Sequence, residues 1–388
     1  MAQRTTTICC SAAALIASIA LAPAKVGRGP IPFFPVRTVW SLALNNQLRQ
    51  PPAYDATRGY FAIDGDRLVA YDLVSGTQQW IVPAALTSAP AAGGGSIFFM
   101  QGDSLTALND GDGSGAWTTS IADKLAVAPA WHAGWLVLAS AAGSIIAIRS
   151  SDGEVIWRRD IGSPAHASPT IAADRVYVPL DNARVVALNV EDGQPVWERR
   201  LGGQPNEILA VDDQLFVGAA DNFLYCLKSS DGIVDWRWRT GADVRGLPAV
   251  DEQRVYFASL DNVLRALNRS NGVQQWIQML RLRPTAGPVK AGATVVVGGL
   301  QPPLRGFNSK DGAPAGEIAA TGELAAPPHL LIDPEGDQPL LLIVTREIGK
   351  GAAVTLVARS SEPPVAPFTA LPNALTTLPA LQEAPTAR

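Results

Sequence analysis

A short sequence phrase recurs along this chain about every 40 residues: a small residue and an apolar residue, then a turn that contains Gly, and then Trp. The intervals between the six full copies are 37, 40, 40, 39 and 40 residues, and a seventh copy has Gly316 in the place of Trp. The full copies end at Trp80, Trp117, Trp157, Trp197, Trp236 and Trp276. A fixed period of this length indicates one supersecondary unit that is repeated in an array.

Each unit has the composition of four short strands. In the unit that ends at Trp197, β-branched and apolar runs alternate with turn residues such as Asp181 and Asn182. The strands expected in this unit are 168–171, 176–180, 184–188 and 195–198. No amphipathic stretch of helix length separates the units, which excludes a parallel sheet with crossover helices. Four-stranded units at this period predict a β-propeller, in which each unit is one antiparallel blade.

The two ends of the repeated region predict how the ring closes. Trp40 lies one period before Trp80 but has no three strands in front of it. Three strands at 327–332, 339–344 and 353–358 lack a fourth. Joining the strand around Trp40 to these three gives an all-β, eight-bladed propeller without free edges. Seven blades with an irregular remainder are the alternative.

The recurring Trp has a structural explanation, because a large flat ring can cover the gap between adjacent blades. The residues expected to dock in this way are Trp40, Trp80, Trp117, Trp157, Trp197, Trp236 and Trp276.

The N-terminal residues are typical of an export signal. Arg4 precedes an apolar stretch from Ile8 to Leu21, and small residues near its end fit a cleavage pattern. The stretch is short for a membrane span, although an uncleaved anchor is the alternative. We therefore expect no transmembrane span in the mature chain. The expected domains are a signal peptide at 1–24, a linker at 25–35, the propeller at 36–360 and a disordered Pro/Ala-rich tail at 361–388.

Composition narrows the possible functions. The formal net charge is −4 and 17% of the residues are charged, which argues against nucleic acid as the main partner. The three His residues lie in different units without chelating spacing, so no metal site is expected. Cys226 is the one cysteine outside the signal. It occupies a position that holds Ala in other units, which predicts a small buried residue.

The unit A-L-(D/N)-x-x-(D/T)-G-x-x-x-W resembles the tryptophan-docking repeat of the pyrroloquinoline-quinone-like propellers, over about residues 36–360. Two branches of that family matter here. In the quinoprotein alcohol dehydrogenases, the resemblance implies a quinone and Ca²⁺ at the propeller axis. In the BamB-like branch, it implies a non-catalytic scaffold of outer-membrane protein assembly.

The dehydrogenase branch would require oxygen ligands for Ca²⁺ and a catalytic carboxylate. The nearest candidates are Asn206 and Glu207 as ligands and Asp243 as the base. The vicinal cysteine pair of those enzymes is missing, because Cys9 and Cys10 fall in the signal. Pyrroloquinoline quinone with Ca²⁺ is therefore the alternative, and no cofactor is the expectation.

The BamB-like branch carries a partner-binding loop L-x-L-R-G before one inner strand and an Asp pair before the next. Residues 242–246 match the first loop with Ala for the first Leu, whereas 283–288 lack both acids. The resemblance thus implies partner binding at Val244, Arg245 and Gly246, and His166 holds the corresponding position in another blade. A salt bridge from Arg245 to Asp243 is the alternative explanation of that arginine.

We therefore predict a non-enzymatic protein-interaction scaffold. The implied location is the periplasm or the outer-membrane periphery of a Gram-negative bacterium. The implied partner is an envelope protein such as a component of the barrel assembly machinery, with the chain a monomer or part of a hetero-complex. A quinone-dependent dehydrogenase, an inactive relative of one, or a propeller that binds a small polar ligand or glycan are the alternatives.

Overall fold

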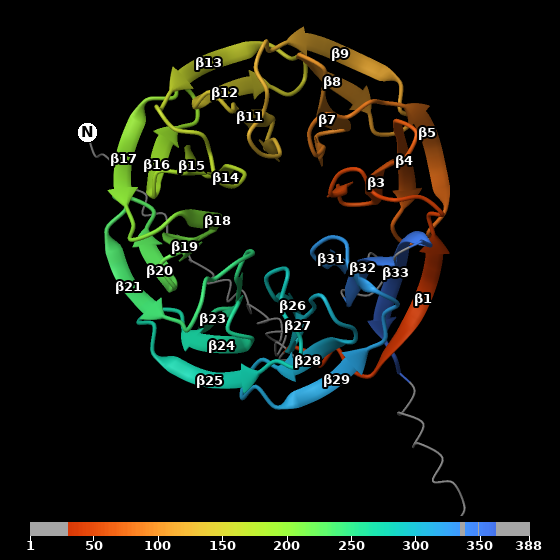
Figure 1. The fold of residues 1–388 in the computed structure, drawn as a ribbon, viewed down its shortest axis with the longest axis vertical. Coiled ribbons are helices and arrows are strands. Elements are labelled where there is room, and N and C mark those ends of the chain that lie inside the picture. The colour runs from red at the N-terminus through yellow and green to blue at the C-terminus, as the bar shows by residue number, and fades with distance from the viewer. Residues whose placement is uncertain (1–29, 334–337, 348, 362–388) are drawn as a thin grey trace, which may run out of the picture. The chain divides into compact units, whose positions relative to one another are not determined.

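The repeated unit folds as a four-stranded antiparallel sheet, and seven such sheets with an eighth that has one additional short strand form a closed ring (Figure 1). The computed structural model describes residues 30–333, 338–347 and 349–361. The propeller belongs to the compact unit that begins at Pro32. Its strands have the following bounds, given for each blade from the innermost strand to the outermost.

Blades 1 to 4 are β2 (Ala53–Tyr54), β3 (Arg58–Ile63), β4 (Arg67–Asp72) and β5 (Gln78–Pro83); β6 (Ala91–Gly93), β7 (Ser96–Gln101), β8 (Ser104–Asn109) and β9 (Gly115–Ser120); β10 (Ala130–His132), β11 (Trp135–Ala139), β12 (Ser144–Arg149) and β13 (Val155–Asp160); and β14 (Thr170–Ala172), β15 (Arg175–Pro179), β16 (Arg184–Asn189) and β17 (Pro195–Arg200).

Blades 5 to 8 are β18 (Pro205–Val211), β19 (Gln214–Ala219), β20 (Phe223–Lys228) and β21 (Val234–Arg239); β22 (Ala249–Val250), β23 (Arg254–Ser259), β24 (Val263–Asn268) and β25 (Gln274–Met279); β26 (Val289–Ala291), β27 (Thr294–Val297), β28 (Leu304–Asn308) and β29 (Pro314–Ile318); and β30 (Glu323–Leu324) with β31 (His329–Ile332), β32 (Pro339–Glu347), β33 (Gly351–Arg359) and β1 (Val36–Ala43).

The eighth blade combines the two ends of the propeller. Strand β1 pairs antiparallel with β33, from Val36 opposite Arg359 to Ala43 opposite Ala353, and Figure 1 shows the two strands side by side. The predicted closure and the count of eight blades are confirmed, and the seven-bladed alternative is wrong. The predicted signal at 1–24 and the tail beyond Ser361 lie outside the described residues. Within the described ranges, no helix has the length and apolar character needed to cross a membrane.

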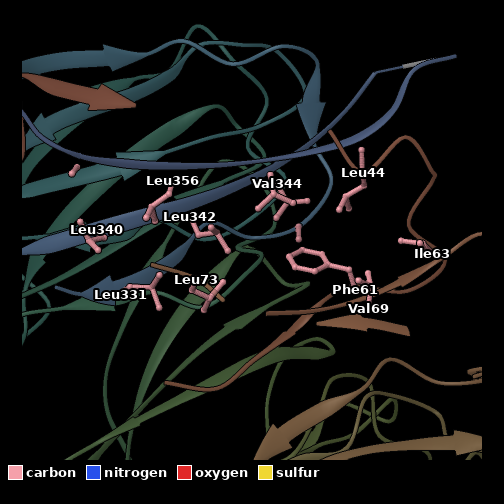
Figure 2. Close-up of a cluster of buried hydrophobic side chains, with 14 residues drawn as sticks. Leu44, Phe61, Ile63, Val69, Leu73, Leu331, Leu340, Leu342, Val344 and Leu356 are labelled. Atoms are coloured by element: carbon pink, nitrogen blue, oxygen red, sulfur yellow. The ribbon is translucent and has the colours of Figure 1, made fainter. Parts of the chain in front are cut away.

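The middle strands of the blades are buried on both faces because each blade is packed between two neighbours. Figure 2 shows one such cluster, in which Leu342, Val344 and Leu356 of blade 8 pack with Phe61 and Val69 of blade 1. Contacts of this kind hold adjacent blades together through apolar burial.

The recurring Trp residues join each blade to the next. The Nε1 atom of Trp157 donates to the carbonyl oxygen of Val190 at 2.7 Å, across the boundary between blades 3 and 4. Its ring lies against Gly193, where an added Cβ would be 2.6 Å from a ring carbon, so a side chain has no room there. The equivalent bonds run from Trp40 to Val74, Trp80 to Asp110, Trp117 to Ser150, Trp197 to Ser229, Trp236 to Arg269 and Trp276 to Ser309.

The seventh blade replaces this contact with an aromatic residue from the N-terminal segment. An added Cβ at Gly306 or Gly316 would lie 2.0 or 2.3 Å from the ring of Phe34. Phe33 is completely buried among residues of blades 7 and 8, and its N–H donates to Thr294 Oγ1 at 3.1 Å. The loss of Trp at Gly316 therefore makes space for Phe34. The last residues of the segment expected to be a linker, 25–35, are part of the core between two blades.

Candidate docking site at one pole of the propeller

One pole of the ring is built from the loops that connect successive blades. In five blades the incoming loop pairs with the end of the second strand before it enters the first strand. These bridges join Leu48 to Ile63, Leu125 to Ser140, Ala165 to Leu180, Val244 to Ser259 and Pro284 to Gly299. The residues that follow, including His166, Arg245 and Thr285, are exposed. Each loop is therefore fixed by backbone pairing while it presents one side chain at the pole.

The loop at 243–248 has the most constrained backbone of the predicted site. Val244 is completely buried, and an added Cβ at Gly218 would lie 2.6 Å from its carbonyl oxygen. Gly246 has a φ of +75°, and a Cβ there would lie 2.1 Å from the N atom of Gly287 in the next blade. Val244 and Gly246 thus position the loop rather than offer side chains to a partner, and this corrects the expectation for Val244.

Arg245 is the exposed residue of this loop. No ion pair between Arg245 and a carboxylate, Asp243 included, is present among the described residues, so the salt-bridge explanation of this arginine is wrong. A guanidinium without an internal partner keeps five N–H donors available to a binding partner.

His166 lies in the loop that enters blade 4 at the same pole, two blades from the loop that carries Arg245. Its Nδ1 donates to Asp181 Oδ1 at 2.8 Å, which fixes the orientation of the ring. His166 lines a cavity of about 410 Å³ together with Gln50, Thr87, Ala126 and Glu207, from five blades. His166 and Arg245 are therefore both at the pole, but Arg245 does not line this cavity.

The candidate ligands for Ca²⁺ and a quinone do not form a matching donor set. The Nδ2 atom of Asn206 donates to the carbonyl oxygen of Val244 at 2.6 Å, which uses its amide to hold the neighbouring loop. Glu207 lines the cavity, whereas Asp243 does not. The described part of the chain holds no group of three His, Cys, Asp or Glu side chains that could bind a metal ion. The residues present therefore do not fit pyrroloquinoline quinone with Ca²⁺, and no reaction step follows from that cofactor.

Two arginines that follow Trp276 in the sequence belong to the pole. Strand β25 ends at Met279, so Arg281 and Arg283 lie in the loop that leads into blade 7, where both are exposed. Arginines beside the Trp residues of blades 3 to 5 lie on the outer strands instead. Arg158 pairs with Asp123 at 2.6 Å, Arg199 Nε donates to Gly232 O at 2.7 Å, and Arg237 lies over the ring of Phe223 at 4.8 Å.

Sequence reasoning also missed one member of the ring of exposed loop residues. Arg49 follows the Leu48 bridge in blade 1, and its guanidinium pairs with Asp64 at 2.8 Å. The sequence does contain an indication of this residue. Arg49 lies three residues before Pro52, which precedes strand β2, and Arg245 lies at the same distance before Pro248.

The sequence matches the family described as outer membrane protein assembly factor BamB, over residues 37–127, 101–211 and 181–325. The chain belongs to the BamB family. These overlapping matches cover blades 1 to 7 and their connecting loops. Among curated proteins, none matches the sequence significantly.

Solved structures agree on the fold of this BamB-family chain. BamB from Moraxella catarrhalis is 19% identical, with a TM-score of 0.68, over 84% of this chain and 98% of that one. The computationally designed Ika8 protein is 12% identical, with a TM-score of 0.66, over 80% and 96%. Quinohemoprotein alcohol dehydrogenase from Comamonas testosteroni is 12% identical, with a TM-score of 0.65, over 86% and 78%. At these identities the likeness establishes the propeller, not an activity.

Proposed function

We propose that this protein is a non-enzymatic scaffold of the cell envelope that binds a protein partner at the pole presenting Arg245. Membership in the BamB family supports a role in outer-membrane protein assembly and a location in the periplasm or at the outer-membrane periphery. A component of the barrel assembly machinery is the partner that this family suggests.

The observation that carries the proposal is the geometry of the Arg245 loop. A rigid loop loses little conformational freedom on binding, so more of the interaction energy appears as affinity. The backbone of this loop is fixed on both sides, by the Val244–Ser259 bridge and by the close approach of Gly246 to Gly287, whereas the Arg245 side chain is free. Arg is also among the residues enriched at energetically important positions of protein interfaces.

The proposal is tested by capture of partners from an envelope extract. Wild-type protein should retain a barrel-assembly component. The Arg245→Glu variant should retain at most about one tenth as much, because reversal of an interface charge costs at least about 1.4 kcal/mol of binding free energy. Lys310→Glu is the matched control, since Lys310 is an exposed cation in the turn at the other end of blade 7. Equal recovery with both variants would count against the Arg245 pole.

The dehydrogenase alternative has its own experiment. Pyrroloquinoline quinone and Ca²⁺ are added to the protein, and absorption, thermal unfolding and dye-linked alcohol oxidation are recorded. We expect no stoichiometric complex and no oxidation, because Asp243 does not line the cavity with Glu207 and the described residues hold no cluster of three ligating side chains. A one-to-one complex with turnover of alcohol would overturn the scaffold proposal.

A further inference from the structure

We propose that a second patch at this pole recognises an acidic protein segment with aliphatic side chains. This inference rests on the scaffold function proposed above and identifies the chemistry of the partner. The patch, called here the arginine surface, consists of Leu247, Arg281, Arg283 and Leu300, beside Arg245. All five residues are exposed.

The arginine surface is continuous because its loops are in contact. A Cβ added at Gly287 would lie 1.8 Å from the carbonyl oxygen of Leu247, so the loops into blades 6 and 7 touch. The N–H of Leu300 donates to the carbonyl oxygen of Arg283 at 3.1 Å, and the N–H of Arg283 donates to Gln301 Oε1 at 3.0 Å. Three segments distant in sequence therefore form one rigid patch.

The patch has an excess of positive charge although the whole chain is acidic. Arg245, Arg281 and Arg283 form no ion pair with any described residue. Three carboxylates of the nearby blades are already paired with other arginines. These pairs are Asp261 with Arg265 at 2.6 Å, Glu317 with Arg305 at 3.1 Å and Glu323 with Arg346 at 2.5 Å. Three guanidinium groups thus face solvent with Asp243 as the one unpaired carboxylate in the same loops, in a chain of net charge −4.

The exposed leucines argue for a protein segment rather than a lipid surface. Leu247 and Leu300 are 47% and 40% exposed beside the unpaired arginines. Apolar side chains with interspersed Arg are typical of protein interfaces, where Arg binds carboxylates through two parallel hydrogen bonds. Recognition of anionic lipid usually needs clusters of about four to eight basic residues, more than this surface provides. An acidic segment with aliphatic residues matches both the charge and the apolar area.

The probe is a fluorescent peptide of alternating Asp and Leu, with an Asp/Ser peptide and a Lys/Leu peptide for comparison. Anisotropy is measured with wild type, Arg281→Glu/Arg283→Glu, Leu247→Ser/Leu300→Ser and the Lys310→Glu control. We expect binding of the Asp/Leu peptide that falls with salt and is weakened about tenfold or more by either double variant, but not by Lys310→Glu. All substituted residues are exposed, so circular dichroism and melting temperature should match wild type.

Several outcomes would overturn the inference. These are equal binding of the Asp/Leu and Lys/Leu peptides, no binding of the Asp/Leu peptide, or an affinity unaffected by Arg281→Glu/Arg283→Glu. If the protein sediments with phosphatidylglycerol vesicles but binds no peptide, the arginine surface is assigned to lipid instead. If an envelope partner depends on Arg245 but is captured equally by Arg281→Glu/Arg283→Glu, the scaffold function stands and the arginine surface is rejected.

Discussion

The aromatic contact at blade 7 gives a quantitative prediction. Phe33 is 0% exposed and lies in the core between blades 7 and 8. Truncation to Ala removes the ring but keeps the backbone N–H that donates to Thr294. Removing a fully buried Phe ring loses its transfer free energy and leaves a cavity, so Phe33→Ala should lower the free energy of unfolding by about 3–5 kcal/mol.

The assay is equilibrium unfolding in denaturant, followed by Trp fluorescence. A lower midpoint with an unchanged slope reports a loss of stability rather than a different unfolded state. Val39→Ala is the matched control, because Val39 is 38% exposed on the adjacent strand β1 and should change stability by less than about 0.5 kcal/mol. If Phe33→Ala and Val39→Ala have the same midpoint, the N-terminal segment does not seal the two blades.

Three further predictions concern single buried groups. His329 stacks on Tyr54 with ring centroids 4.1 Å apart, and burial lowers its pKa to about 4 from the usual 6.5. The unfolded chain therefore takes up this proton first. The contribution of neutral His329 to stability is full above about pH 6.5 and decreases by up to about 3 kcal/mol as the pH falls toward 4. The His329→Phe variant should lack this decrease when denaturation midpoints are measured against pH. A pH dependence equal to that of wild type would contradict the assignment. Trp157→Phe keeps an aromatic ring but removes the pyrrole part of the indole and with it the 2.7 Å bond to Val190, and should lower the free energy of unfolding by about 1–2 kcal/mol in denaturant unfolding. A midpoint equal to wild type would mean that this bond adds nothing to the packing. Cys226 is completely buried, and burial raises the pKa of its thiol to about 12. A thiol reagent at pH 8 should therefore react with this residue only after unfolding, and rapid reaction of the native protein would refute its burial.

Much of the fold could be predicted because the repeat is periodic. The Trp spacing defined the blades, and the isolated Trp40 revealed which strand completes the ring. Each of these inferences depends on residues whose partners lie one period away. Pairing of Cys226 opposite Trp236 on the next strand likewise follows from the position that it shares with Ala in other blades.

The contacts that the sequence did not reveal do not recur with the repeat period. Phe34 packs on Gly306 and Gly316 from the other end of the chain, and no recurring pattern marks such a contact. Val244 was grouped with Arg245 because both belong to the loop that resembles the family motif, although alternate residues of a paired loop point to opposite sides. The identity of the binding residues depends on such local departures.

Closure of the ring by β1 has a consequence for the order of folding. Val36 pairs with Arg359, so the strand that is synthesised first obtains its partner only when the last blade has been made. Blades 1 to 7 can each form from neighbouring residues, whereas blade 8 needs segments more than 300 residues apart. Completion of blade 8 therefore has the largest entropic cost of loop closure. Phe33 and Phe34 pack beside it, between blades 7 and 8. Local opening should start at this blade, which makes it the place where hydrogen exchange would first detect loss of the closed ring.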